Sequence, residues 1–328
     1  MIFKNLFLLL FLIQTTQLFA KYTNCTFQNE NYSDICQKVV KNGVSIEYAN
    51  RFLLSFRTKL TDKVSWKYLQ PNKIKQHRLN EKRANISLAK RYLPMMLKNL
   101  KKYKKVYDYV EKKYGVNREV IAAILLKETK FGTIKLRHDA FIVFNTMVLK
   151  SPAQTSREKW LLRMGKENIA ELIKYCYKGN IKPNQCQLGS SYAGAVGIAQ
   201  FMPTSFTYAK SYKNKTPKLW KMEDAIVSVA SYLHQKANWN KLLDWSKVPN
   251  MLDIEKAWYD FELMNDNASF VYAKSKRTGK KFACYGCRFK KLAYIKEYAK
   301  KVMKYNNSSN YAIGVLSLAY NAHKHLRR

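Results

Sequence analysis

Acidic residues are scarce in this chain: 22 Asp and Glu stand against 60 Lys and Arg in 328 residues, a formal net charge of +38. The imbalance favours polyanionic partners, which include nucleic acid, anionic lipid and acidic cell-wall polymers. Charge alone does not choose among them, because a solvated lysine-rich surface gives the same count. No internal repeat or low-complexity linker is present, and 47% hydrophobic residues exclude wholesale disorder.

Long apolar runs are also lacking, and the one near the N-terminus is too short for a comfortable transmembrane helix. Lys4 precedes an apolar run over residues 6–13, and Leu18-Phe19-Ala20 ends the segment. This pattern is typical of a secretory signal peptide over residues 1–20. Tyr22-Thr23-Asn24-Cys25 is not a lipid-attachment box, so we expect an exported protein that is not a lipoprotein.

The six cysteines fall into three local pairs, which are Cys25 with Cys36, Cys176 with Cys186, and Cys284 with Cys287. In an oxidising compartment local disulfides are the default, and unpaired buried thiols are the alternative. The last pair also has the spacing of half a zinc site, but one such pair without further ligands is weak evidence for metal. Export argues against nucleic acid as the physiological partner.

One helix carries the most informative residue. Ile121, Ile124 and Leu125 lie seven, four and three positions before Glu128, so all four share one helical face. A carboxylate on an apolar face is withdrawn from water, which raises its pKa, as a general acid near neutral pH requires. The alternative is a buried glutamate paired with Arg or Lys.

A second segment runs from Gly189 to Pro203 and contains Gly194 and Gly197, where a chain can turn tightly. Gln200 offers an amide suited to sugar hydroxyl and acetamido groups. The segment is not a phosphate loop, because it lacks the Gly-Lys-Ser/Thr ending.

The remaining pattern is mainly helical. The exception is a small β-hairpin that we expect around Arg277-Thr278-Gly279.

Three segments, in order, resemble the MltB-type lytic transglycosylases, a lysozyme-like family. The first is Tyr114-Gly115-Val116 leading to Glu128-Thr129-Lys130-Phe131-Gly132, and the second is SYAGAVGIAQFMP over residues 191–203. The third is Tyr305-Asn306-Asn307-Ser308, continuing through Tyr311-Ala312. The similarity covers residues 93–318 and implies a mainly α, lysozyme-like fold.

The resemblance implies roles for individual residues. Glu128 matches the catalytic acid, and Asp139 matches an acidic residue that we interpret as structural. Positions that line the muramoyl subsite match Ser191, Gln200, Tyr232, Tyr305, Asn306 and Tyr311.

The predicted organisation has five parts. These are a signal peptide (1–20), a helical N-terminal extension (21–92), a lysozyme-like catalytic core (93–240), a small insertion (241–290) and the C-terminal part of the core (291–328).

The implied activity is cleavage of the β-1,4 bond between N-acetylmuramic acid and N-acetylglucosamine in peptidoglycan, leaving 1,6-anhydro ends, by a monomeric periplasmic enzyme without a cofactor. We expect its basic surface to associate with the cell wall or with anionic surfaces. Some relatives bind calcium in the loop that corresponds to residues 208–218, but here that loop has no acidic side chain, so we predict no metal. A muramidase-type hydrolase and a catalytically idle peptidoglycan-binding protein remain the alternatives.

Overall fold

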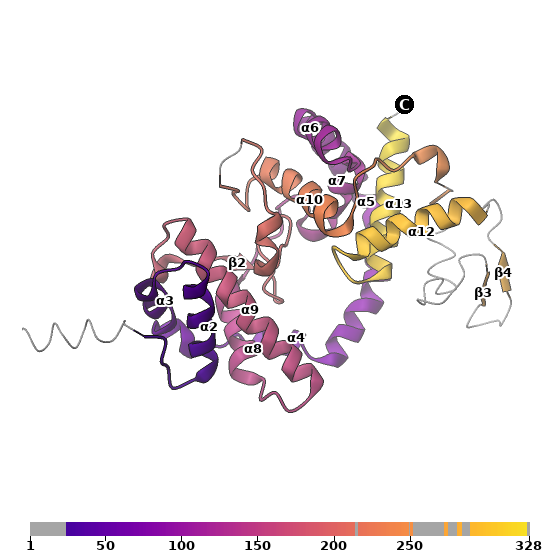
Figure 1. Cartoon of the computed structure of the whole chain (residues 1–328). Helices are drawn as coiled ribbons and strands as arrows, with labels where there is room; N and C mark the ends of the chain where they lie inside the picture. Colours follow the sequence, from indigo (N-terminus) through magenta and orange to yellow (C-terminus); the bar gives the residue numbers. More distant parts are fainter. Residues whose placement is uncertain are drawn as a thin grey trace, which may run out of the picture. The chain divides into compact units, whose positions relative to one another are not determined.

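The computed structural model describes residues 24–213, 216–248, 250–251, 272–274, 281–283 and 289–326. Helices dominate this part of the chain, as predicted (Figure 1). They belong to two compact units. Unit 1 comprises residues 1–69, 136–196 and 201–206, and unit 2 comprises residues 70–135, 197–200 and 207–328. The predicted signal peptide and the pair Cys284 and Cys287 lie outside the described residues.

Unit 1 is built on a long helix, α9, and the helices α8 and α2 make the most contacts with it (Figure 1). Its helices are α2 (Glu30–Lys41), α3 (Ile46–Leu53), α4 (Lys63–Tyr68), α8 (Ala140–Lys150) and α9 (Ser156–Lys178), with short 3-10 turns η1 (Phe56–Lys59) and η2 (Pro183–Gln185). A capping box of Thr155 and Glu158 starts α9, because each side chain satisfies a backbone N–H that the first helical turn leaves free.

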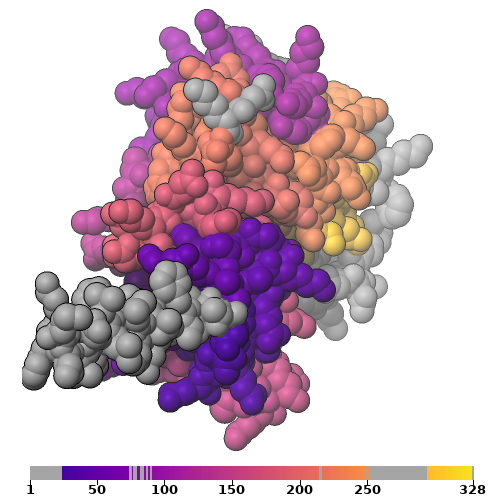
Figure 2. All heavy atoms as spheres, turned by 60° about the vertical axis from the view of Figure 1, so that its left-hand side comes forward, coloured from indigo at the N-terminus to yellow at the C-terminus, as the bar shows by residue number. Residues whose placement is uncertain are grey.

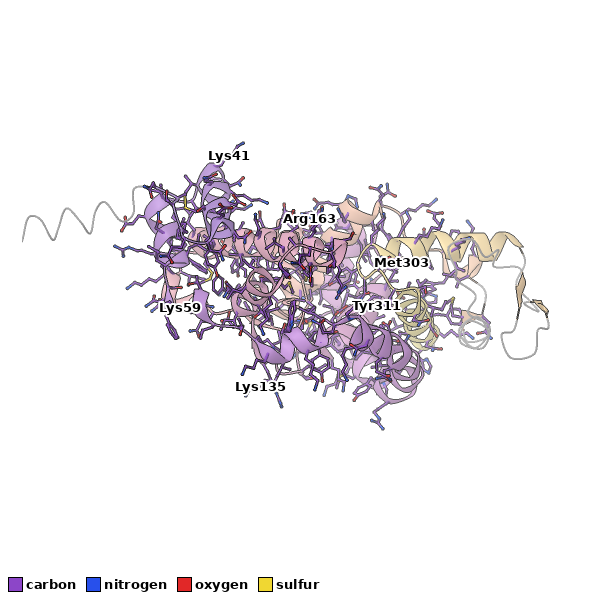
Figure 3. The ribbon with its side chains drawn as sticks, turned by 90° about the horizontal axis from the view of Figure 1, so that it is seen from below. Lys41, Lys59, Lys135, Arg163, Met303 and Tyr311 are labelled. Atoms are coloured by element: carbon purple, nitrogen blue, oxygen red, sulfur yellow. A yellow bond between two sulfur atoms is a disulfide. The ribbon has the colours of Figure 1, made fainter. Side chains whose placement is uncertain are left out.

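Lysine side chains are exposed on the surface of unit 1. The indigo atoms in Figure 2 show α2 and α3 on the outside of this unit. Lys41 and Lys59 are exposed, and their side chains extend away from the ribbon (Figure 3).

Two of the three predicted disulfides are confirmed. Cys25 bonds to Cys36 and Cys176 bonds to Cys186. The first ties the start of the described chain to α2, and the second ties the last turn of α9 to the segment after η2. Both close short local loops, the arrangement that the cysteine spacing predicted.

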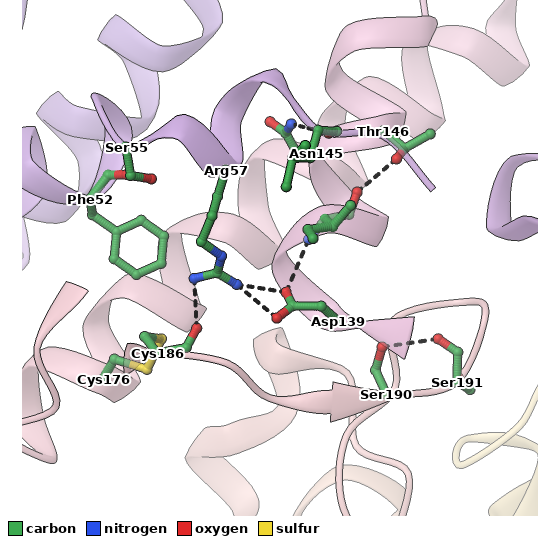
Figure 4. Close-up of polar contacts among 12 residues, drawn as sticks. Phe52, Ser55, Arg57, Asp139, Asn145, Thr146, Cys176, Cys186, Ser190 and Ser191 are labelled. Carbon is green, nitrogen blue, oxygen red and sulfur yellow. Dashed lines mark hydrogen bonds and ion pairs between the residues drawn. A yellow bond between two sulfur atoms is a disulfide. The ribbon is translucent and has the colours of Figure 1, made fainter. Parts of the chain in front are cut away.

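A polar cluster around Asp139 joins distant parts of unit 1 (Figure 4). The short strand β1 (His138–Asp139) directly precedes α8 in the chain. It pairs antiparallel with a second short strand, β2 (Gly189–Ser190). Asp139 caps α8 by accepting from the Ile142 N–H at 3.2 Å. Both of its oxygens also accept from the Arg57 guanidinium, at 2.7 and 2.8 Å, and Arg57 donates to the Cys186 carbonyl at 2.8 Å. Asp139 therefore has the structural role that the sequence suggested.

Unit 2 surrounds the helix that carries Glu128. Its helices are α5 (Pro71–Lys102), α6 (Lys104–Tyr114), α7 (Arg118–Thr129), α10 (Met222–Ala237), α12 (Phe289–Met303) and α13 (Ser309–Leu326). The short turn η4 (Trp245–Lys247) also belongs to it, whereas η3 (Pro203–Tyr208) begins in unit 1. Helix α7 is buried on nearly every side by α5, α6, α10 and α13, because its residues from Val120 to Leu126 are all apolar. Helix α5 continues through residues 92 and 93, where the sequence suggested a domain boundary.

The turn before α7 differs in one detail from what its sequence suggests. Gly115 ends α6 in the left-handed conformation, with φ +66°. Asn117 occupies the N-cap position of α7, but its side chain makes no capping bond. It instead donates to the Leu243 carbonyl at 3.0 Å and accepts from the Leu243 N–H at 2.6 Å. Asn117 thus fixes a segment more than a hundred residues away, which local sequence does not reveal.

The predicted hairpin is confirmed, since β3 (Tyr272–Lys274) pairs antiparallel with β4 (Lys281–Ala283). Within the described residues, no helix combines the length and apolar character needed to cross a membrane.

Replacing Arg57 with alanine should lower the free energy of unfolding by about 2–4 kcal/mol, because it strips donors from a half-buried carboxylate and a carbonyl. Arg51→Ala is the control, since its ion pair with Glu47 is 59% exposed on both sides and should contribute less than about 0.5 kcal/mol. Urea denaturation of both variants measures the difference, and equal losses would contradict this role of Arg57.

Candidate active site

Glu128 lies in the last turn of α7, where the backbone conformation changes sharply. Lys130, Phe131 and Gly132 follow with φ values of +48°, +57° and +81°. Consecutive left-handed residues are unfavourable for non-glycine side chains and are found mainly at functional sites. The chain therefore leaves α7 abruptly and leaves Glu128 half-buried at the helix end.

Thr129 holds this helix end to the glycine-containing loop of residues 197–200. Its hydroxyl donates to the Ile198 carbonyl at 2.8 Å and accepts from the Gly132 N–H at 2.9 Å. A Cβ on Gly132 would lie 3.1 Å from the Ile198 side chain. Two of the motifs that carry the family resemblance are thus joined directly.

The Glu128 carboxyl has one close protein partner among the described residues. The Tyr311 hydroxyl, on α13 of unit 2, donates to Glu128 Oε1 at 2.6 Å, and Tyr311 is labelled in Figure 3. Desolvation raises the pKa of Glu128 to about 7, although the Tyr311 hydrogen bond and the Lys127 charge act in the opposite direction. The pKa of Glu128 is therefore raised in the direction that the apolar helical face predicted, and a large fraction of this carboxyl is protonated near neutral pH.

The loop from Gly197 to Gln200 is itself tightly constrained. Gly197 has φ +75°, and a Cβ there would lie 2.5 Å from the Leu219 carbonyl oxygen. The Ile198 N–H donates to that same carbonyl at 2.9 Å. Gln200 also has a positive φ, +50°, and its amide donates to the Gly197 carbonyl at 2.9 Å. The Gln200 side chain is therefore held by its own loop.

Tyr232, on α10, and Tyr305, in the turn after α12, pack against each other in unit 2. The Tyr305 hydroxyl donates to the Ala199 carbonyl, which ties the segment after α12 to the glycine-containing loop. The Tyr305 ring meets that of Tyr232 edge to face, with centroids 5.1 Å apart. The Tyr232 hydroxyl donates to the Lys304 carbonyl at 2.8 Å. Tyr232 is only 8% exposed, so its contacts support the position of Tyr305.

The structure thus places most of the predicted site residues in unit 2: Glu128, Gln200, Tyr232, Tyr305, Asn306 and Tyr311. Asn306 is exposed next to Tyr305. Ser191 belongs to unit 1, where its hydroxyl accepts from the Ala195 N–H at 3.2 Å. Its place in the substrate site remains a prediction.

The loop of residues 208–218 does not fit a calcium site. Asp224, on α10, accepts hydrogen bonds through both carboxylate oxygens from the described part of this loop. Oδ1 accepts from the Tyr212 N–H at 3.0 Å and from the Ser211 hydroxyl at 3.2 Å, and Oδ2 accepts from the Lys218 N–H at 2.8 Å. A hard cation needs several free oxygen ligands, whereas lysines occupy this loop. The Asp224 carboxylate organises it instead.

These features agree with the comparisons. A family model described as the transglycosylase SLT domain matches residues 27–320. The chain belongs to this transglycosylase family. The match spans most of the sequence and confirms an enzyme of the kind that the three motifs indicated. No curated protein sequence matches the chain.

Three solved structures with a similar fold are distant from this chain in sequence. The Escherichia coli lytic transglycosylase Slt35, in complex with bulgecin A, has a TM-score of 0.62 and 18% identity, covering 92% of this chain and 95% of Slt35. Pseudomonas aeruginosa SltB1 has a TM-score of 0.57 and 20% identity, covering 90% and 100%. Pseudomonas aeruginosa SltB3, in complex with NAG-anhNAM-pentapeptide, has a TM-score of 0.55 and 17% identity, covering 88% and 77%. The predicted lysozyme-like transglycosylase fold is therefore confirmed.

The direct contact between Tyr311 and Glu128 was not predictable from the sequence, in which Tyr311 matched only the sugar site. Lys127 and Glu81, which lie next to this pair, were not predicted as site residues either. One signal was available, because Lys127 directly follows the apolar residues 120–126 of the helix that carries Glu128.

Gly197→Ala should destabilise this transglycosylase more than Gly43→Ala. Both glycines have similar positive φ values, +75° and +84°, but the Cβ at Gly43 meets nothing within 4 Å. Gly43→Ala therefore reports backbone strain alone, on the order of 1 kcal/mol. The additional clash at Gly197 should cost about 2 kcal/mol more, measured by urea denaturation. Equal losses would show that the loop relaxes freely.

Proposed function

We propose that this transglycosylase cleaves the β-1,4 bond between N-acetylmuramic acid and N-acetylglucosamine in peptidoglycan and leaves 1,6-anhydro-N-acetylmuramic acid ends. The observation that carries this proposal is the hydrogen bond from Tyr311 to the Glu128 carboxyl at the end of α7, where burial raises the pKa of Glu128 to about 7. A general acid with a pKa near 7 can donate its proton at neutral pH.

The reaction uses the same carboxyl twice. Glu128 donates its proton to the glycosidic oxygen as the bond to C1 breaks, while the acetamido group of the substrate stabilises the developing positive charge. The resulting carboxylate then accepts the proton of the muramoyl 6-hydroxyl, whose oxygen bonds to C1. The proton returns to Glu128, so no water is consumed.

The described surroundings of Glu128 support a mechanism with one carboxylate. Most glycosidases use two carboxyl groups, one on each side of the scissile bond. Glu81 is the other carboxylate that acts electrostatically on Glu128. It accepts from the Ser308 hydroxyl at 2.7 Å and lies 3.8 Å from the Lys127 ammonium, so it is committed to neighbours within the protein.

The substrate contacts that we propose are those that the family resemblance implies. We propose that Gln200, Tyr305 and Asn306 hold the muramoyl residue, that Ser191 also binds the substrate, and that Tyr232 supports Tyr305. Tyr311 contacts Glu128 and acts through it. The binding of NAG-anhNAM-pentapeptide by SltB3 supports a glycan strand as the substrate.

The setting that we propose is the periplasm, reached through the signal peptide. Peptide stems of peptidoglycan carry carboxylates, which the +38 chain would attract. This adsorption would weaken as salt increases.

Digestion of purified sacculi, with mass spectrometry of the products, tests the activity and the bond together. Wild-type enzyme should release muropeptides with anhydro ends. Glu128→Gln, which keeps the shape but has no proton to donate, should reduce the rate at least about a hundredfold. Glu47→Gln is the control, because Glu47 lies 59% exposed on the surface of unit 1.

Three results would contradict the proposal in different ways. Reducing muramoyl ends would indicate hydrolysis by water. Wild-type activity in Glu128→Gln would exclude Glu128 as the acid. Binding to sacculi without any cleavage would indicate a catalytically idle binding protein.

A further inference from the structure

A buried lysine precedes the catalytic glutamate. The Lys127 side chain is only 5% exposed, although lysine is almost never buried unless it is paired. Successive residues of a helix do not face each other, so Lys127 and Glu128 point in different directions. Tyr311 joins them: the Lys127 ammonium lies 4.9 Å from the centre of its ring, and its hydroxyl donates to Glu128.

Helix α5 supplies the partners of this lysine. The ammonium lies 3.8 Å from Glu81 Oε1 and donates to the Asn85 side-chain oxygen. Asn85 is 1% exposed, and its amide donates to the Asn310 carbonyl at 2.8 Å. Gly314 provides the space, because a Cβ there would lie 2.5 Å from the Asn85 side chain.

The same group of contacts fixes the start of α13. The Ser308 hydroxyl donates to Glu81 Oε2 at 2.7 Å and accepts from the Tyr311 N–H at 3.1 Å. Glu81 is therefore linked to Tyr311 both through Lys127 and through Ser308. The three helices α5, α7 and α13 contact one another in this region, next to Glu128.

We propose that Lys127 and Glu81 are positioning residues that act as a pair on Glu128. Lys127 holds the Tyr311 ring so that its hydroxyl reaches Glu128, and Glu81 holds Lys127. Their charges have opposite signs, so removal of either one should change the pH range over which Glu128 keeps its proton.

The charges of the pair act on Glu128 with opposite signs. A positive charge within a few ångströms favours a carboxylate and lowers its pKa, and a negative charge raises it. Burial is the largest cause of the raised pKa of Glu128, and against that background Lys127 lowers this pKa while Glu81 raises it. Removal of one member exposes the charge of the other.

Other ionisable groups around α7 do not act on Glu128 in this way. Tyr305 and Tyr232 are neutral phenols whose pKa values burial raises. At the opposite end of α7, Asp108 and Glu111 of α6 pair with Arg118, and His323 pairs with Glu119. Lys130, at the end of α7, donates to the Tyr92 hydroxyl at 2.7 Å.

A titration of the Glu128 carboxyl by carbon NMR tests the proposal. The protein carries glutamate labelled at the carboxyl carbon, and the signal missing in Glu128→Gln identifies Glu128. Lys127→Met should raise its midpoint and Glu81→Gln should lower it, each by roughly half a pH unit or more. The double variant should return close to wild type.

The controls separate charge from packing. Lys127→Arg keeps the charge and should keep the midpoint. Lys130→Met removes a neighbouring cation that also lies over a tyrosine ring, 4.5 Å from the centre of Tyr92, and should leave the midpoint unchanged. If Lys127→Met does not fold, the decrease in Glu81→Gln still tests the sign.

An unchanged Glu128 midpoint in Lys127→Met and Glu81→Gln, with only a loss of thermal stability, would overturn the proposal and leave the pair a structural ion pair. The proposal rests on Glu128 being the acid of the proposed function, yet the titration uses no substrate. Failure to digest sacculi would therefore contradict the proposed function without affecting the measured shifts.

Discussion

A single hydrogen bond, from the Tyr311 hydroxyl to Glu128 at 2.6 Å, is the contact on which the proposed chemistry depends. It forms at a place withdrawn from water, where burial raises the pKa of Glu128 to about 7. Desolvation alone would penalise the carboxylate that the second half of the reaction needs, and the Tyr311 donor offsets part of that penalty. Because the pKa lies near 7, the protonated and ionised forms of Glu128 are both populated near neutral pH.

The surrounding fold keeps this contact in place. Thr129 ties the end of α7 to the glycine-containing loop, and Tyr305 ties the same loop to the segment after α12. The close approach of Gly197 to Leu219 leaves the loop little freedom. Such preorganisation lets donors act without reorganising during the reaction.

Local patterns in the sequence were sufficient for much of this account. The apolar spacing around Glu128 predicted a buried acid, and the cysteine spacing predicted the disulfides Cys25–Cys36 and Cys176–Cys186. Contacts between distant segments were not predictable in the same way. Glu81 lies 46 positions before Lys127, in a stretch interpreted as an extension. Asn117 is a favourable residue for a helix N-cap, but its side chain hydrogen-bonds to the backbone of Leu243 and not to the first turn of α7. Periodicity reports which face is buried, and it does not report which side chains meet there.

The pH dependence of stability tests most directly whether burial holds the proton of Glu128. A pKa near 7 in the folded state, against about 4.5 unfolded, means that the folded protein binds more protons between these values. The free energy of unfolding of wild type relative to Glu128→Gln should therefore fall as pH rises from about 4.5 to 7, by on the order of 2 kcal/mol, and then level off. Urea denaturation of both proteins across this range measures it. A difference that stays constant with pH would contradict the account.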